Sequence, residues 1–394
     1  MSVRVSYKRQ FIVGIFFLLV VLSVVEIVSR VVLDLLDPRS SYCTSTVIQS
    51  GIYYNYTNSQ IAQLCHDYYS MKTYSLYTKS YSYVAHAPNQ HTITFNINGD
   101  GLRGPELSAK DKNTYRIFLL GGSTMLGQLS TSDNTTIPGY LQQEFNNLKT
   151  GYKIEVINAG VGGATSFHEY ELIKEKLIHY NPDLIIVDDG WNDLNYPLTE
   201  SNEGKMPLVY QIQKQVAELD DYYKTPRFID SVITFLDSRI SEKLHSRDMN
   251  SSDTEITDVS EKAYLWKSRW AEICKLGKEN RFDVIVTLQP VLGAGKKPLT
   301  GWEIHALDKV HYRSIAPSYP ALRNALSDLD KECARTEDLS SIFDNVNKTI
   351  FYDLGHMGDA GNSIMAEKLF ELSKPIVLQK LHNDYISTYN STKT

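Results

Sequence analysis

The stretch RIFLLGGST, residues 116–124, decides the fold, because a short apolar run ends there in two glycines and a serine. Apolar runs of this length, bounded by turn residues, are typical of strands that are buried on both faces. Two glycines allow a tight turn and a close approach of the backbone, which pushes the hydroxyl of Ser123 out at the end of the strand. The stretch therefore predicts a buried strand with a reactive side chain at its carboxyl end.

Similar strands alternate with helices on the C-terminal side of this stretch. This alternation argues for an α/β fold with a parallel sheet that helices cover on both faces. A polar stretch at 194–261 interrupts it and is predicted to be an insertion. The predicted strands are 116–120, 153–157, 183–187 and 284–288, and the predicted helices are 138–148, 166–180 with Ser166 as its N-cap, 262–281, 321–336 and 360–381.

The N-terminal residues predict a membrane anchor. Residues 11–31 are about as long as the ~20 residues of a bilayer-spanning helix, and Phe11 to Val25 carries no charge. Arg4, Lys8 and Arg9 precede it, so the positive-inside bias leaves residues 1–10 in the cytoplasm and the remainder outside the cell membrane. A cleaved signal peptide is the alternative, but no A-x-A-like site follows the apolar run. Residues 37–110 are polar and Tyr-rich without a long periodic segment, which predicts a stalk and lead-in that could cover one edge of the α/β domain that follows it.

Net charge and cysteine spacing bear on which ligands and cross-links the chain can have. The net charge of −6 gives no electrostatic reason to expect nucleic acid as a partner. Four cysteines on the outer side of the anchor are compatible with two disulfides, and their spacing lacks the C-x-x-C pair of zinc sites. Of the three possible pairings we prefer Cys43–Cys65 with Cys274–Cys333.

Polar and glycine-rich motifs follow the predicted strands, where parallel α/β sheets bind their ligands. These motifs are GGST at 121–124, NAGVGGATS at 158–166, GWND at 190–193 and, near the C-terminus, DLGH at 353–356. Each is weak alone, but all four occur in order at the ends of successive elements.

The four motifs in this order resemble the blocks of the SGNH (GDSL-like) hydrolases. The resemblance covers about 112–384, leaves 385–394 as a tail, and implies a flavodoxin-like three-layer α/β/α sandwich. By position, Ser123 would be the nucleophile, His356 its base and Asp353 the partner that orients the base. The backbone N–H groups of Ser123 and Gly163 and the side-chain amide of Asn192 would form the oxyanion hole.

Two further features bear on this resemblance. The lead-in FNINGDGLRGPE, residues 95–106, resembles the segment before the catalytic block in many surface-associated members. The first block commonly reads Gly-Asp-Ser in the family, whereas Gly122 replaces the Asp here. That Asp is not part of the triad, so the change removes no chemistry.

The chemistry agrees with the residue types. A serine hydroxyl needs a base to take its proton, and an acid on the other imidazole nitrogen fixes the tautomer. Such a site requires no metal and no organic cofactor. Asp188, Asp189 and Asp193 could ligate a cation, but acids at strand ends are more often helix caps or solvated groups.

Other residues are candidates for contact with substrate. Gln289 and Pro290 follow a predicted strand and should border the pocket, with a substrate-facing loop at 292–299. Trp191 could stack on a sugar, cover an acyl chain or simply pack beside the pocket. His168 and His179 lie on a predicted helix and are interpreted as structural.

Three functions fit the sequence. The first is an extracytoplasmic esterase for short acyl esters, O-acetyl groups of surface glycans included. The second is an O-acyltransferase that passes the acyl group to a sugar hydroxyl, which a single-span anchor disfavours because it offers no route for a cytoplasmic donor. The third is a non-catalytic glycan-binding protein, for which the Tyr-rich segment is the support.

Overall fold

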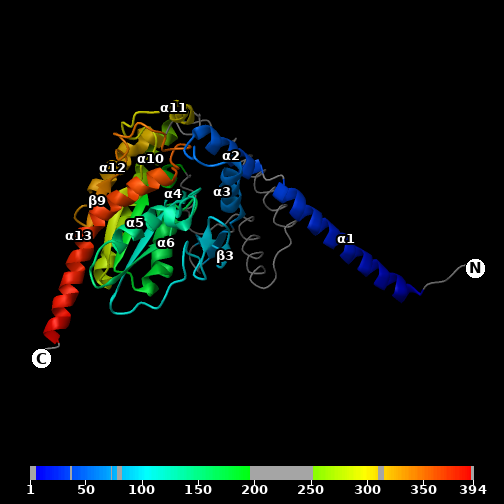
Figure 1. Cartoon of the computed structure of the whole chain (residues 1–394), viewed down its shortest axis with the longest axis horizontal. Helices are drawn as coiled ribbons and strands as arrows, with labels where there is room; N and C mark the ends of the chain where they lie inside the picture. Colours follow the sequence, from blue (N-terminus) through cyan, green and yellow to red (C-terminus); the bar gives the residue numbers. More distant parts are fainter. Residues whose placement is uncertain are drawn as a thin grey trace, which may run out of the picture. The chain divides into compact units, whose positions relative to one another are not determined.

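In the computed structural model of the protein, the apolar run at 116–120 lies inside a five-stranded parallel sheet (Figure 1). The spatial order of the strands is β6-β5-β7-β8-β9, which corresponds to 2-1-3-4-5 along the chain, the flavodoxin-like arrangement. The predicted parallel α/β fold is therefore confirmed. The strands are β5 (Thr114–Gly121), β6 (Lys153–Asn158), β7 (Leu184–Asp189), β8 (Asp283–Leu288) and β9 (Arg335–Asp338).

The structure describes residues 6–35, 38–71, 73–77, 82–195, 252–308 and 315–391, so most of the predicted insertion lies outside the described residues. The chain divides into two units, 1–39 with 203–252 and 40–202 with 253–394. In the first unit, helix α1 (Tyr7–Leu35) contains a segment, Tyr7–Val25, with a mean hydropathy of 2.0. Among the described residues this segment alone has the length and composition to cross a membrane, a test that signal sequences also pass.

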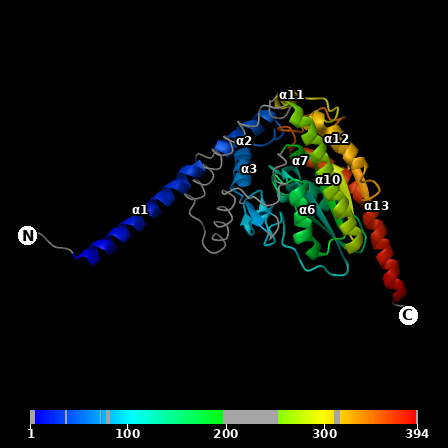
Figure 2. The same cartoon turned by 180° about the vertical axis from the view of Figure 1, so that it is seen from behind.

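The central strands are buried because helices cover both faces of the sheet. Every residue of β5 and of β7 is buried. Helices α5 and α13 pack together on one face (Figure 1), and α10 covers the other (Figure 2). The helices of this unit after β5 are α4 (Ser123–Leu126), α5 (Ile137–Asn146), α6 (Ser166–Glu175), α7 (Trp191–Asn195), α10 (Ser252–Asn280), α11 (Gly301–Leu307), α12 (Ile315–Ser327) and α13 (Asp359–Ser391), with 3-10 turns at Asp133–Thr135 and Leu177–Tyr180.

Three predicted boundaries were wrong. The helix predicted at 321–336 ends at Ser327, and the chain then forms β9, whose polar sequence RTED suits an edge strand and hides it from a search for apolar runs. The N-cap of α6 is Thr165 rather than Ser166, because Thr165 forms a capping box with His168. Helix α13 continues to Ser391, so residues 385–391 are not a separate tail.

The lead-in predicted at 37–110 is not an irregular stalk, because it folds into helices and hairpins that pack against the sheet domain. It contains α2 (Pro38–Ser50), α3 (Asn58–Ser70) and the hairpins β1 (Thr73–Tyr77) with β2 (Ser82–His86) and β3 (Gln90–His91) with β4 (Asn96–Ile97). Residues such as Val47 and Leu64 form a small core with Leu129 and Tyr352 of the sheet domain. A disulfide, Cys43–Cys65, joins α2 to α3, and with Cys274–Cys333 it confirms the preferred pairing.

Candidate active site

Ser123 lies where the sheet changes its direction of winding. Ser123 begins α4 immediately after β5. The next two strands along the chain, β6 and β7, lie on opposite sides of β5 in the sheet. Ligand sites of open α/β sheets occur at the carboxyl edge of such a switch point. The turn that the sequence predicts at the two glycines therefore puts the Ser123 hydroxyl at the place where the fold favours a site.

Three predicted catalytic side chains meet at this edge. The Ser123 Oγ lies 2.6 Å from the Nε2 of His356, and the Nδ1 of His356 lies 2.7 Å from the Oδ2 of Asp353. A bridge between Phe351 and Met357 closes the loop that carries both partners. These distances fit a chain of hydrogen bonds from a carboxylate through an imidazole to a hydroxyl.

The Asp353 carboxylate is suited to hold a cationic imidazole. Its Oδ1 accepts hydrogen bonds from the backbone N–H groups of Gly355, at 3.1 Å, and of His356, at 2.8 Å. Burial would raise the pKa of this carboxyl, but the His356 ring and the two N–H groups hold that pKa below its usual value. Asp353 therefore stays ionised over the neutral range and can fix the His356 tautomer.

Two aromatic rings hold the His356 imidazole in place. The Trp191 ring meets it edge-on at 4.9 Å between centroids, and the Tyr352 ring stacks on it at 5.7 Å with 13° between the planes. Gly355 allows this packing, because a Cβ there would lie 2.2 Å from the Trp191 ring. Trp191 thus packs against His356, the candidate base, and its contact with a substrate stays a prediction.

The oxyanion-hole candidates lie on the loop after β6 and at the start of α7. Gly163 has a φ of +76°, a left-handed conformation that favours glycine. The Asn192 Nδ2 donates to the Ala164 carbonyl at 2.6 Å, and its second hydrogen stays available because an amide nitrogen carries two. The side chain of Asn192 is thus held at the edge that Ser123 occupies.

The unusual glycine of the first block has a structural reason. A Cβ built on Gly122 would lie 2.4 Å from the Asn192 Nδ2, which is far closer than non-bonded atoms approach. The φ of Gly122 is −73°, so the backbone itself would accept a side chain. Space for the Asn192 amide, and not backbone freedom, therefore accounts for glycine here.

A group of buried acids lies behind the site. Asp193 accepts from the N–H of Ser166 at 3.0 Å and from its hydroxyl, which fixes the end of the glycine-rich loop. Asp188 accepts from the Thr287 hydroxyl at 2.9 Å, and burial raises the pKa of Asp188 to about 7. Burial also raises the pKa values of Asp189 and Asp193. Within the residues that the structure describes, no cluster of histidines, cysteines and acids could hold a metal ion.

The residues directly after β8 are buried next to the turn that carries Ser123. Gln289 is 3% exposed, and its Nε2 donates to the Thr124 Oγ1 at 2.7 Å, beside the candidate nucleophile. Pro290 is buried, and the Leu292 N–H donates to the Leu354 carbonyl at 2.8 Å. Gln289 therefore supports the turn at Ser123 from behind, and direct contact of Gln289 and Pro290 with a substrate stays a prediction.

Two residues that support the segment of Ser123 were not predicted from the sequence. Arg103, in the lead-in FNINGDGLRGPE, is buried and donates to the carbonyls of Leu126 and Gly127 at the end of α4 and to Asp133. The resemblance of this lead-in to other surface-associated members was the available indication, although it gave no contact. Asp359, three residues after His356, accepts from Thr131 and so ties the base loop to the segment after α4.

Of the two histidines that are interpreted as structural from the sequence, His168 is buried and bonded within its own helix cap, and His179 is exposed. The Nδ1 of His168 lies 2.9 Å from the Thr165 Oγ1, and burial followed by the charge of Arg269 lowers the pKa of His168 to about 4. His179 lies in the 3-10 turn Leu177–Tyr180.

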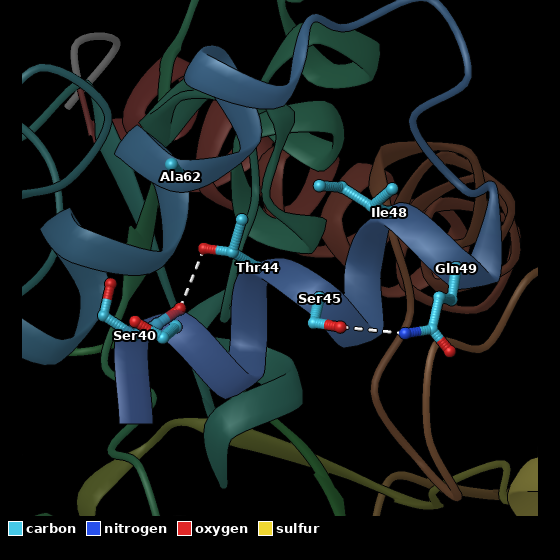
Figure 3. Close-up of a pocket in the computed structure, with 7 residues that line it drawn as sticks. Ser40, Thr44, Ser45, Ile48, Gln49 and Ala62 are labelled. Carbon is cyan, nitrogen blue, oxygen red and sulfur yellow. Dashed lines mark hydrogen bonds between the residues drawn. The ribbon is translucent and has the colours of Figure 1, made fainter. Parts of the chain in front are cut away.

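A separate hollow of about 490 Å³ lies on α2 (Figure 3). Within α2, the Thr44 hydroxyl donates to the Ser40 carbonyl and the Gln49 amide donates to the Ser45 hydroxyl. None of the predicted site residues contributes to it. Its lining residues are Ser40, Ser41, Thr44, Ser45, Ile48, Gln49 and Ala62.

Comparisons with known proteins give structural likeness only. No family model and no curated protein matches the chain. Among solved structures it is similar to the acetyl xylan esterase AlAXEase, at 14% identity and a TM-score of 0.36 over 65% of this chain and 98% of that one. It is also similar to Axe2, an acetylxylan esterase from Geobacillus stearothermophilus (13%, 0.37, 65% and 93%), and to TesA (13%, 0.39, 66% and 98%).

The class of fold follows from the chain itself. The sheet order 2-1-3-4-5 is the one that the SGNH resemblance implies, and all four motifs lie together around Ser123. The chain therefore has a flavodoxin-like parallel α/β fold, which is the fold that the SGNH resemblance of its sequence predicts. At TM-scores below 0.5 the similar structures contribute nothing to the choice of reaction.

Proposed function

We propose that the protein is a serine esterase that hydrolyses short acyl esters through an acyl-enzyme. The observation that carries this proposal is the continuous contact from Ser123 through His356 to Asp353, at 2.6 and 2.7 Å. A hydroxyl and an imidazole so arranged suit nucleophilic catalysis at neutral pH.

In this mechanism the Ser123 Oγ attacks the ester carbonyl while the Nε2 of His356 takes the hydroxyl proton. The negative charge moves to the carbonyl oxygen, where the N–H groups of Ser123 and Gly163 and the amide of Asn192 would donate to it; each such donor contributes about 10²–10³ in rate. His356 then gives its proton to the leaving alcohol, and the acyl group stays on Ser123. Water, deprotonated by the same imidazole, attacks the acyl group and releases the acid.

We further propose that α1 anchors this enzyme in the cell membrane with the catalytic unit outside. The apolar segment Tyr7–Val25 and the basic residues Lys8 and Arg9 support the anchor and its orientation. The two disulfides support the same side, because disulfides persist in oxidising compartments. The substrate would then be an acyl ester outside the cytoplasm, acylated surface glycans included.

The test is labelling of the full-length protein in detergent with a fluorophosphonate, followed by mapping of the modified peptide. We expect the label on Ser123 and hydrolysis of p-nitrophenyl acetate, with both lost in Ser123→Ala. Equal hydrolysis by this variant would end the proposal. Product formed with a sugar acceptor, in place of free acid, would show transfer to the sugar as the reaction.

A further inference from the structure

The segment before the sheet reaches the candidate site through Tyr68. This residue lies in the last turn of α3, and its hydroxyl lies 3.2 Å from the position that a Cβ on Gly162 would take. Gly162 directly precedes Gly163, the candidate oxyanion donor. Tyr68, Gly162 and Gly163 are all half-buried, so they meet at the surface of the site and not in the core.

Tyr68 is held firmly in this position. The disulfide Cys43–Cys65 fixes α3 one helical turn earlier. The buried carboxylate of Asp67 accepts from both the N–H and the hydroxyl of Thr94, at 2.9 and 2.8 Å. The Tyr68 ring also meets the Phe95 ring edge-on at 6.2 Å. A side chain held by such contacts suits specific recognition, because little of its freedom is lost on binding.

Tyr68 lies on the side of the site that His356 occupies. Its neighbour there is Tyr352, whose ring stacks on His356. Tyr352 belongs to the small core of α2 and α3, and Tyr68 and Tyr69 pack against this same core. Since His356 must protonate the leaving alcohol, the alcohol half of an ester lies on this same side.

A tyrosine at this place offers two kinds of contact. Its ring can cover the C–H face of a sugar, and its hydroxyl can exchange a hydrogen bond with a sugar hydroxyl. Tyr69, in edge contact with Tyr68 at 5.1 Å, widens the aromatic surface. We propose that Tyr68 is a specificity-determining residue that contacts the alcohol half of the ester, and that this alcohol is a sugar. The proposal rests on the esterase function proposed above.

The test compares two acetyl esters with different alcohols, glucose pentaacetate and p-nitrophenyl acetate, on full-length protein in detergent. The readout is kcat/KM for the sugar ester divided by kcat/KM for the nitrophenyl ester. We expect this ratio to fall about tenfold in Tyr68→Ala and about threefold in Tyr68→Phe, which keeps the ring. The control is Tyr54→Ala, because Tyr54 is 84% exposed in the preceding turn, and its ratio should match the wild type.

A ratio within a factor of two of the wild type in both Tyr68 variants would overturn the proposal, as would an equal fall in Tyr54→Ala. If Tyr68→Ala does not fold, Tyr68→Phe decides by the same criterion. Wild-type protein that hydrolyses neither ester and takes no fluorophosphonate label at Ser123 would instead refute the esterase function itself. The two failures are therefore distinguishable.

Discussion

The close approach of Gly122 to Asn192 gives a sharp prediction about catalysis. In Gly122→Ala the new Cβ would lie 2.4 Å from the Asn192 Nδ2, so the amide must move. The amide ends a side chain with rotatable bonds, so this movement should cost little stability, within about 1 kcal/mol. It would nevertheless displace the candidate oxyanion donor, and the loss of such a donor costs about 10²–10³ in kcat, or about 2.7–4 kcal/mol.

The assay is hydrolysis of p-nitrophenyl acetate by four proteins: wild type, Gly122→Ala, Asn192→Ala and the double variant. We expect kcat to fall about 10²-fold in each single variant and no further in the double variant, because no amide is then left to displace. Gly301→Ala is the matched control, since a Cβ at Gly301 meets nothing within 4 Å.

Two results would refute this reasoning. The first is a Gly122→Ala variant with wild-type kcat, which would mean that Asn192 is not needed in its present place. The second is a double variant whose loss equals the product of the two single losses, because the substitutions would then act independently. A large loss of stability in Gly122→Ala would mean that the substitution disrupts the turn at Ser123 and does not only displace the Asn192 amide.

Two further predictions concern stability, measured by urea unfolding of the full-length protein in detergent. Burial raises the pKa of Asp188 from 3.8 to about 7, so the native state keeps a proton that the unfolded state loses, and the contribution of Asp188 to stability falls as pH rises from 4 to 7. Asp188→Asn should remove about 4 kcal/mol of this fall, and identical pH slopes in variant and wild type would contradict it. Replacement of Cys43 and Cys65 by serine should cost about 3 kcal/mol, because it opens a loop with a sequence separation of 22. It should also lower activity on glucose pentaacetate more than replacement of Cys274 and Cys333 does, and an equal loss in both would argue against a role of α3 at the site.

Much of the sheet was predictable because its strands carry their own pattern. β5, β7 and β8 are continuous apolar runs between turn residues, as strands buried on both faces must be. β9 was missed because an edge strand needs no such run, and its four residues are polar. The helices α2 and α3 were missed because they bury few apolar side chains, and the disulfide between them is a contact that no periodicity records.

The candidate site also has a part that could be predicted from the sequence and a part that could not. The motifs named Ser123, Asn192, Asp353 and His356, and the DLGH spacing already brought the last two onto one loop. No spacing could indicate that Gly122 leaves room for the Asn192 amide, or that Gln289 supports Thr124 from 165 positions away. Those relations depend on the distance between backbones after packing.

The sequence by itself determined the apolar N-terminal segment, the buried strands and the residue types of the candidate site, because each depends on local pattern and composition. Only the tertiary structure decided that Ser123 meets His356 across 233 positions and that α3 brings Tyr68 to the glycine-rich loop. The physical reason is that pattern reports which face of an element is buried, whereas contact between distant side chains depends on how the elements pack.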